Sequence, residues 1–218
     1  MATLRQYSIM NRSFFMAIIM VIFAFAKAYS QRNSSDIIFE NSKITTVNIN
    51  LESTIELEIV TTDSQSIRIT DSQGGEYKNA LTLNSSIIND TLQISDPFHA
   101  SFKFPQDKLS AHKIIDDQAK LYLPEGLDVQ LTARSCFLKV TGNYKNLFIN
   151  IESGDCELST VRSPFHIITV YADVNIINPE TTVQINSKNG TIKPAQLKNM
   201  KSNSHKIETI HGSITIKD

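Results

Sequence analysis

Apolar and polar residues alternate with a fixed period between Val129 and Ile216. Five segments carry a small residue at the same point of the pattern: Cys136, Gly154, Ala172, Gly190 and Gly212. The intervals between these residues are 18, 18, 18 and 22 positions. A short fixed period of this kind is typical of a repeat architecture.

The positions around the small residues predict two strands in each segment. The residues five positions before the small residue are all apolar: Leu131, Ile149, Ile167, Ile185 and Ile207. The residues two positions after it are apolar as well: Leu138, Cys156, Val174, Ile192 and Ile214. Apolar residues at alternate positions indicate strands with one buried face. A small residue between two such strands suits a tight bend with little room inside it.

A segment of about 18 residues cannot bury its apolar face alone. Stacking the segments about 4.8 Å apart would join these faces into one continuous core. We therefore expect an all-β fold, a β-solenoid with coils of about 18 residues. An antiparallel sandwich with evenly spaced strands is the alternative, because such sandwiches also place short strands at regular intervals.

The two ends of the pattern are less regular. Apolar residues alternate in short pairs over residues 36–104 without a period. We interpret them as irregular first coils that close the apolar end of the stack, since terminal repeats differ from internal ones. Pro105–Asp117 is expected to hold a loop or a single short helix. Four extra residues within Ala195–Ser204 predict a loop on one face, and the last strand, Ile210–Ile216, is expected to be an open edge.

Residues 1–30 have the pattern of a signal peptide. Arg5 and Arg12 precede an apolar run of 13 residues, and Ala28–Tyr29–Ser30 offers small residues where a signal peptidase requires them. We expect cleavage before Gln31 and a single domain over residues 31–218, located in the periplasm, on the outer surface or in the medium. A membrane anchor is the alternative, but 13 apolar residues are fewer than the roughly 20 that span a bilayer.

Charge narrows the class of partner. The chain has 21 Lys and Arg against 22 Asp and Glu, a net charge of -1, and loss of Arg5, Arg12 and Lys27 with the signal peptide makes it -4. A mildly acidic exported protein has no electrostatic reason to bind nucleic acid or anionic lipid. The expected partner is an unknown protein or glycan at the cell surface, with no membrane span in the mature chain.

Four features of the chain carry a family resemblance. They are the exported N-terminus, the early strand Lys43–Ile49, the segment Leu121–Pro124, and the motifs Ile-x-x-x-Asn-Gly-x-Ile and Ile-x-x-x-His-Gly-x-Ile at 185–192 and 207–214. With these features the chain resembles the bacterial putative adhesin family, which includes the auto-transporter-adhesin-like head GIN domain. The resemblance implies a single-stranded right-handed β-helix or β-roll, a place outside the inner membrane and a role in adhesion. Cys136 and Ala172 depart from the family's glycine at the bend.

The two cysteines are expected to be separate thiols. In the predicted register, Cys136 and Cys156 lie one coil and two residues apart, which places their Cα atoms about 8 Å from each other. Disulfides usually need less than about 7 Å. Cys156 is then a small core residue, although an oxidising compartment would permit a bridge.

A partner would have to bind to the outward-facing columns. Phe148, Ile168 and Val170 are apolar on adjacent coils, and Glu152 and Lys188 supply charge on the same side. We expect these five residues to form the partner-binding surface. The apolar members could instead lie under a neighbouring loop or under the N-terminal coils.

No motif in the sequence indicates a cofactor or a metal. Asp155 and Asp173 fall on adjacent coils and could approach a hard cation such as calcium, but two carboxylates without a third ligand make a poor site. The five histidines lack metal-ligand spacing. We expect His166 to project outward and His205 to occupy an inward column.

The alternative to a binding protein is a carbohydrate-active β-helix enzyme, a polysaccharide lyase or hydrolase. Such an enzyme needs acids or a base on an open groove. The tight group available on the repeats is Arg134, Glu152, Asp155, Asp173 and Lys188. Because the chain has no Trp, a sugar would have to stack on Tyr144, Phe148 or Tyr171. No motif with a catalytic mechanism appears, so we expect no catalytic residues and a non-enzymatic exported adhesion or interaction module. A periplasmic envelope component without adhesive role is a further alternative.

Overall fold

The computed structural model describes residues 33–40, 43–75, 83–98, 102, 115–177, 182–194 and 204–217. In these residues the chain is all-β, with fifteen strands in one sheet that does not close. The strands are β1 (Asn33–Phe39), β2 (Thr46–Leu51), β3 (Glu56–Thr62), β4 (Ile67–Gly75), β5 (Asn84–Ile88), β6 (Thr91–Ser95), β7 (Ile115–Pro124), β8 (Asp128–Thr141), β9 (Asn146–Ser159), β10 (Phe165–Thr169), β11 (Asp173–Ile177), β12 (Gln184–Ser187), β13 (Ile192–Lys193), β14 (His205–Thr209) and β15 (Ile214–Lys217). The predicted signal peptide lies outside the described residues. No helix that could cross a membrane is found in the part of the chain that the structure describes.

The middle of the sheet consists of parallel strands whose partners lie 18 positions apart. Leu131 of β8 pairs with Ile149 of β9, and Ile149 pairs with Ile167 of β10. The same offset joins the second half of β9 to β11. Each of these isoleucine and leucine side chains is fully buried. The columns expected from the sequence are therefore real neighbours in space.

The small residues mark a bend between two strand segments, as the pattern predicts. Cys136 pairs with Gly154, and a Cβ added to Gly154 would overlap the carbonyl oxygen of Cys136. Gly154 also has φ of +105°, which glycine adopts without strain. In two other segments a hydroxyl fixes the bend: Thr209 Oγ1 accepts a hydrogen bond from the Gly212 N–H, and Ser187 Oγ accepts one from the Gly190 N–H, both at 2.9 Å.

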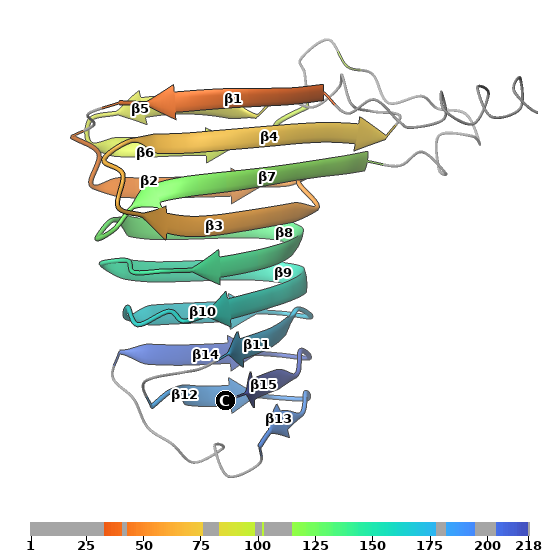
Figure 1. Cartoon of the computed structure of the whole chain (residues 1–218). Coiled ribbons are helices and arrows are strands. Elements are labelled where there is room, and N and C mark those ends of the chain that lie inside the picture. The colour runs from red at the N-terminus through yellow and green to blue at the C-terminus, as the bar shows by residue number, and fades with distance from the viewer. Residues whose placement is uncertain are drawn as a thin grey trace, which may run out of the picture. The chain divides into compact units, whose positions relative to one another are not determined.

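We use the word rung for the strand segments on both sides of one bend, which form a single strand in β8 and in β9 and two strands in the later rungs. The rungs do not stack in chain order at the C-terminal end. β14 pairs with β10 on one side and β12 on the other, and β15 lies between β11 and β13 in the same way (Figure 1). The last rung of the chain is thus inserted between the two rungs that precede it.

This order corrects the expectation that Ile210–Ile216 forms an open edge. β14 and β15 are paired on both sides, and the described strands that pair on one side only at this end are β12 and β13. A chain that returns by one rung needs a longer connection than one that advances by one. The four extra residues within Ala195–Ser204 are consistent with that need. Residues 195–203 themselves lie outside the described part.

The N-terminal strands cap the parallel stack. β2 and β3 extend it, since each pairs in parallel with β8. β6 pairs in parallel with β2, and β7 with β3. Beyond them the pairing becomes antiparallel, between β4 and β7, β1 and β4, and β5 and β6. The irregular first strands therefore differ from the internal ones in direction as well as in spacing. Most of the stretch Pro105–Asp117 is not described, and β7 begins within it, at Ile115.

One hydrophobic core runs through the described strands. Both cysteines belong to it as free, buried thiols, as expected. Burial raises the pKa of Cys136 to about 12 and raises that of Cys156 as well. Neither thiol is therefore reactive at neutral pH.

Candidate functional site

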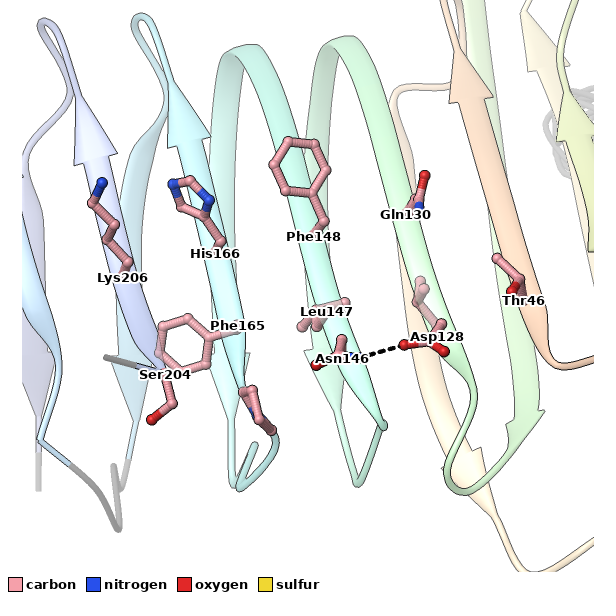
Figure 2. A pocket seen from close by; sticks show the side chains of 12 residues that line it. Thr46, Asp128, Gln130, Asn146, Leu147, Phe148, Phe165, His166, Ser204 and Lys206 are labelled. Atoms are coloured by element: carbon pink, nitrogen blue, oxygen red, sulfur yellow. Dashed lines mark hydrogen bonds between the residues drawn. The ribbon is translucent and has the colours of Figure 1, made fainter. Parts of the chain in front are cut away.

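Four outward side chains form a row across four neighbouring strands. Gln130 of β8 pairs with Phe148 of β9, Phe148 with His166 of β10, and His166 with Lys206 of β14. Alternation along a strand turns these residues outward, because Val129, Leu147, Phe165 and His205 beside them point into the core. Figure 2 shows the row from Gln130 to Lys206.

The first residues of β2, β8 and β9 form one side of a groove beneath this row. Thr46 pairs with Asp128, and Asp128 with Asn146. The groove has a volume of about 600 Å³. It is lined by Thr46, Asp128, Val129, Gln130, Asn146, Leu147, Phe148, Pro164, Phe165, His166, Ser204 and Lys206 (Figure 2). This size suits a few sugar or amino-acid residues rather than a large folded partner.

The groove carries an aromatic pair beside an ion-pair network. The rings of Phe148 and His166 meet edge to face, with centroids 5.7 Å apart. His166 Nε2 and Lys206 Nζ each lie 2.9 Å from Glu208 Oε2. Hydrogen bonds from Lys206, and to a smaller extent from His166, lower the pKa of Glu208. The groove therefore offers an apolar surface next to fixed polar groups.

Asp128 forms the second charged point of the groove. Its carboxylate accepts a hydrogen bond of 2.8 Å from Lys145 Nζ. It accepts a second one from the Asn146 amide, which is drawn in Figure 2. The bond from Lys145 is the main cause of a lowered pKa of Asp128. A carboxylate held in its charged form can accept hydrogen bonds from a ligand, but it is a poor proton donor at neutral pH.

The structure distributes the five expected partner-binding residues over more than one place. Phe148 lines the groove. Ile168 and Val170 are half-buried on the rung of β10, and Glu152 and Lys188 are exposed. β14 separates the rungs of Val170 and Lys188, so Lys188 lies farther from Glu152 than chain order implies. The role of these residues in binding stays a prediction.

The group considered for enzymatic chemistry lies at the bend and away from the groove. Asp155 and Asp173 are paired neighbours, and Asp173 Oδ1 accepts a hydrogen bond of 2.6 Å from the Ser213 N–H. No cluster of three or more potential metal ligands occurs among the described residues. His205 is buried in the inward column, where it was expected. Its ring meets the Phe165 ring edge to face, with centroids 4.9 Å apart.

Sequence reasoning missed most of the groove. Gln130, Phe148 and His166 lie 18 positions apart, so the period could have placed them in one outward row. Lys206 and Thr46 could not be found in this way, because their rungs join the row through pairings that the chain order does not indicate.

A cluster of three buried carboxyl groups at the N-terminal end was also missed. Asp71, Asp96 and Asp117 are at most 3% exposed. Asp96 accepts hydrogen bonds from the N–H groups of residues 52–54 and from Thr54 Oγ1. Its carboxylate therefore gives a partner to the backbone donors at the bend after β2. Burial, followed by a hydrogen bond with Asp71, raises the pKa of Asp117 to about 7, and burial raises that of Asp71.

The chain has the same fold as a solved structure, but its sequence matches no family model and no curated protein. No family model matches the chain, and no curated protein matches it. Among solved structures, a "putative cell adhesion protein" from Clostridium sporogenes matches 86% of this chain and 99% of its own with a TM-score of 0.64 at 15% identity. A "putative adhesin" from Bacteroides fragilis covers 85% and 96% with a TM-score of 0.38 at 10% identity. A "putative lipid binding protein" from Parabacteroides distasonis covers 84% and 96% with a TM-score of 0.31 at 11% identity. The first of these shows that the two chains have the same fold.

Proposed function

We propose that this protein is an exported, non-enzymatic adhesion or interaction module that binds a ligand in the groove of Phe148, His166 and Lys206. The observation that carries the proposal is the groove itself, built from outward side chains of four strands in register. The Clostridium sporogenes protein with the same fold is described as a putative cell adhesion protein, which agrees with this role.

The architecture proposed for the module is a β-solenoid with coils of about 18 residues. The constant 18-residue offset between β8, β9, β10 and β11 supports it, because each turn of a solenoid stacks in parallel on the next. Such a stack places like positions of successive rungs in rows on its surface. The groove is one product of those rows.

Binding is favoured over catalysis by the state of the two acids in and beside the groove. A glycoside hydrolase needs one carboxyl group with a raised pKa as the proton donor. Here the pKa values of Asp128 and Glu208 are both lowered by their lysine partners. A lyase or hydrolase built on Glu152, Asp155 and Asp173 at the bend remains the second candidate, and a turnover assay on polysaccharides tests it.

The groove can be tested by measuring retention of the purified chain on immobilised glycans and host proteins. The Phe148→Ala variant removes the aromatic wall, and Lys206→Ala removes the cation on its far side. We expect each variant to lose binding about tenfold, since one buried aromatic contact or one charged hydrogen bond is worth about 1–2 kcal/mol. Phe137→Ala is the matched control, because Phe137 is an exposed aromatic outside the groove. Equal binding by all three variants would contradict the groove as the site.

Export is tested separately by fractionating cells that carry an epitope-tagged full chain. We expect the tag outside the cytoplasm and the mature protein shortened by the length of residues 1–30. Recovery in the periplasm alone, without surface exposure, would favour an envelope component without adhesive role.

A further inference from the structure

A second exposed surface lies at the bend of the C-terminal rungs. Tyr171 and His211 directly precede the small bend residues Ala172 and Gly212. The Tyr171 side chain is 59% exposed, and its ring stacks on the His211 ring with centroids 5.1 Å apart and an interplanar angle of 8°. Half-buried Val170 and exposed Ile210 directly precede Tyr171 and His211 in the chain. We call Tyr171, His211, Val170 and Ile210 the bend platform.

The backbone and a neighbouring amide hold the bend platform in place. The Tyr171 N–H donates to the Glu152 carbonyl, and the His211 N–H donates to the Val170 carbonyl, both at 2.8 Å. The Asn189 side-chain amide lies 3.2 Å from His211 Nδ1. An exposed aromatic ring that is fixed in this way loses little conformational entropy when a ligand covers it.

His211 stacks on one face of the Tyr171 ring, and we call the opposite face, toward β9, the open face. His211 belongs to the rung of β14, whereas Ser153 occupies the corresponding position on β9, on the opposite side of Tyr171. Ser153 is short, and its hydroxyl donates to the Arg134 carbonyl at 3.3 Å. The ring face toward β9 therefore stands above a small side chain instead of a second ring.

Two exposed carboxylates lie close to Ser153 along β9. Glu152 directly precedes Ser153, and Asp155 follows it after Gly154. Asp173 lies next to Asp155 and is held by the Ser213 N–H. An aromatic face packs against the C–H face of a sugar ring, while carboxylate oxygens accept hydrogen bonds from its hydroxyl groups. Arg134 of β8 lies beside Glu152, because its neighbours Ala133 and Ser135 pair with Ile151 and Ser153. The three carboxylates outnumber this one cation, so they disfavour an anionic sugar.

We propose that the bend platform binds a neutral or amino sugar of a glycan, with the sugar ring stacked on the open face of Tyr171 and its hydroxyl groups bonded by Glu152 and Asp155. The proposal rests on the interaction role proposed above and names the class of partner, but its site is separate from the groove. A folded protein partner fits the platform less well. The platform has four apolar or aromatic side chains bordered by charged residues, whereas stable protein interfaces bury about 800 Å² on each partner.

The test uses the full purified chain and four soluble probes: chitotetraose, cellotetraose, mannotetraose and the anionic tetragalacturonate. Because the chain has 6 Tyr and no Trp, tyrosine fluorescence reports on Tyr171 without a tryptophan background. Saturation-transfer NMR gives an independent measure of contact. We expect at least one neutral or amino probe to bind and tetragalacturonate to bind more weakly.

The variants locate the sugar. Tyr171→Ala should weaken binding about tenfold, and Tyr171→Phe should retain it because the ring is kept. Glu152→Gln combined with Asp155→Asn should reduce the preference for neutral over anionic probes. Tyr122→Ala is the matched control, since Tyr122 is a half-buried aromatic on β7, a strand that pairs with β3 and β4 and not with the strands of the bend platform.

Two outcomes overturn the proposal. The first is that no probe binds, or that Tyr171→Ala binds as well as the unchanged chain. The second is that Phe148→Ala abolishes sugar binding while Tyr171→Ala does not, which would place the sugar in the groove and leave the proposed function intact. If the groove variants bind every ligand as well as the unchanged chain does, while Tyr171→Ala loses sugar binding, the bend platform is supported and the groove proposed above is contradicted.

Discussion

At the scale of single residues, the most unusual groups are the buried acids at the N-terminal end. Asp71 and Asp117 come from the paired strands β4 and β7, and Thr54 joins Asp117 to Asp96 through hydrogen bonds of its hydroxyl. Asp71 also accepts a bond of 2.8 Å from Gln73 Nε2. Two neighbouring carboxyl groups in an apolar site hold a shared proton more tightly than either would alone.

This cluster predicts that stability falls as the pH rises from about 4 to about 7. Asp117 has a pKa of about 7 in the folded protein and an ordinary value of 3.8. The folded state therefore binds more protons than the unfolded state in this window, so the free energy of unfolding decreases with pH. We expect Asp117→Asn to flatten this dependence and to add about 1–3 kcal/mol of stability above pH 7, because an amide keeps a donor toward Asp71 without a charge.

Urea unfolding of the two proteins between pH 4.5 and 8 measures this effect. Asp155→Asn serves as the control, since Asp155 is exposed. Parallel pH profiles for Asp117→Asn and the unchanged chain would show that the buried pair does not control the titration.

At the scale of strands, the decisive feature is the position of β14 and β15. β12 and β14 have isoleucine at the same point of their segments, Ile185 and Ile207, so either strand could pack next to Ile167. In the fold Ile207 does so, and Ile185 packs on its far side. Equivalent rungs are interchangeable in local pattern, and only the pairing of the complete chain selects their order.

Cysteine pairs can test this order on the outer surface. Asn175 pairs with Thr215, and Thr215 with Lys193, all on one outward row. Neighbouring strands lie about 4.8 Å apart, within the range of a disulfide, whereas two strand spacings exceed it. We expect Asn175→Cys with Thr215→Cys to form a disulfide on mild oxidation, and Asn175→Cys with Lys193→Cys to remain reduced. Both native thiols are buried and interfere little.

Peptide mass mapping without reductant identifies the bridge. The reverse result, a bridge between positions 175 and 193 only, would restore the chain-order stack.

At the scale of the whole molecule, the described sheet ends at strands that pair on one side only. β12 and β13 form one such end, and the positive charges of Lys188 and Lys193 lie at it. Charged side chains on an edge strand discourage pairing with another chain. The other end differs, because β1 and β5 are antiparallel to their partners and carry the exposed Ile38, Ile87 and Ile88.

Removal of the edge charges should promote self-association. We expect Lys188→Thr combined with Lys193→Thr to form dimers or larger species in sedimentation velocity at concentrations where the unchanged chain does not. The matched control is Lys120→Thr combined with Lys139→Thr, which removes the same charge from β7 and β8, strands paired on both sides. Association of the control to the same extent would mean that charge alone, and not the edge, is responsible.

The sequence by itself determined the all-β class, the bends and the strand segments on both sides of each bend, although β8 and β9 each run through the bend as one strand. It also determined which apolar residues of the repeats are buried, because these properties depend on local spacing, but it did not indicate the buried Asp71, Asp96 and Asp117. Ile149 and Ile167 face the core for the same reason that their neighbours Phe148 and His166 face outward. Phe148 could therefore be expected on the outer surface before its neighbours were known.

Only the tertiary structure decided the order of the last two rungs, and with it the composition of both candidate sites. Lys206 completes the groove and His211 supports Tyr171 because the rung of β14 and β15 is inserted beside that of β10 and β11. The apolar pattern is the same in every segment, so it specifies that rungs stack but does not distinguish one partner from another. The choice is made by the whole set of contacts between the rungs.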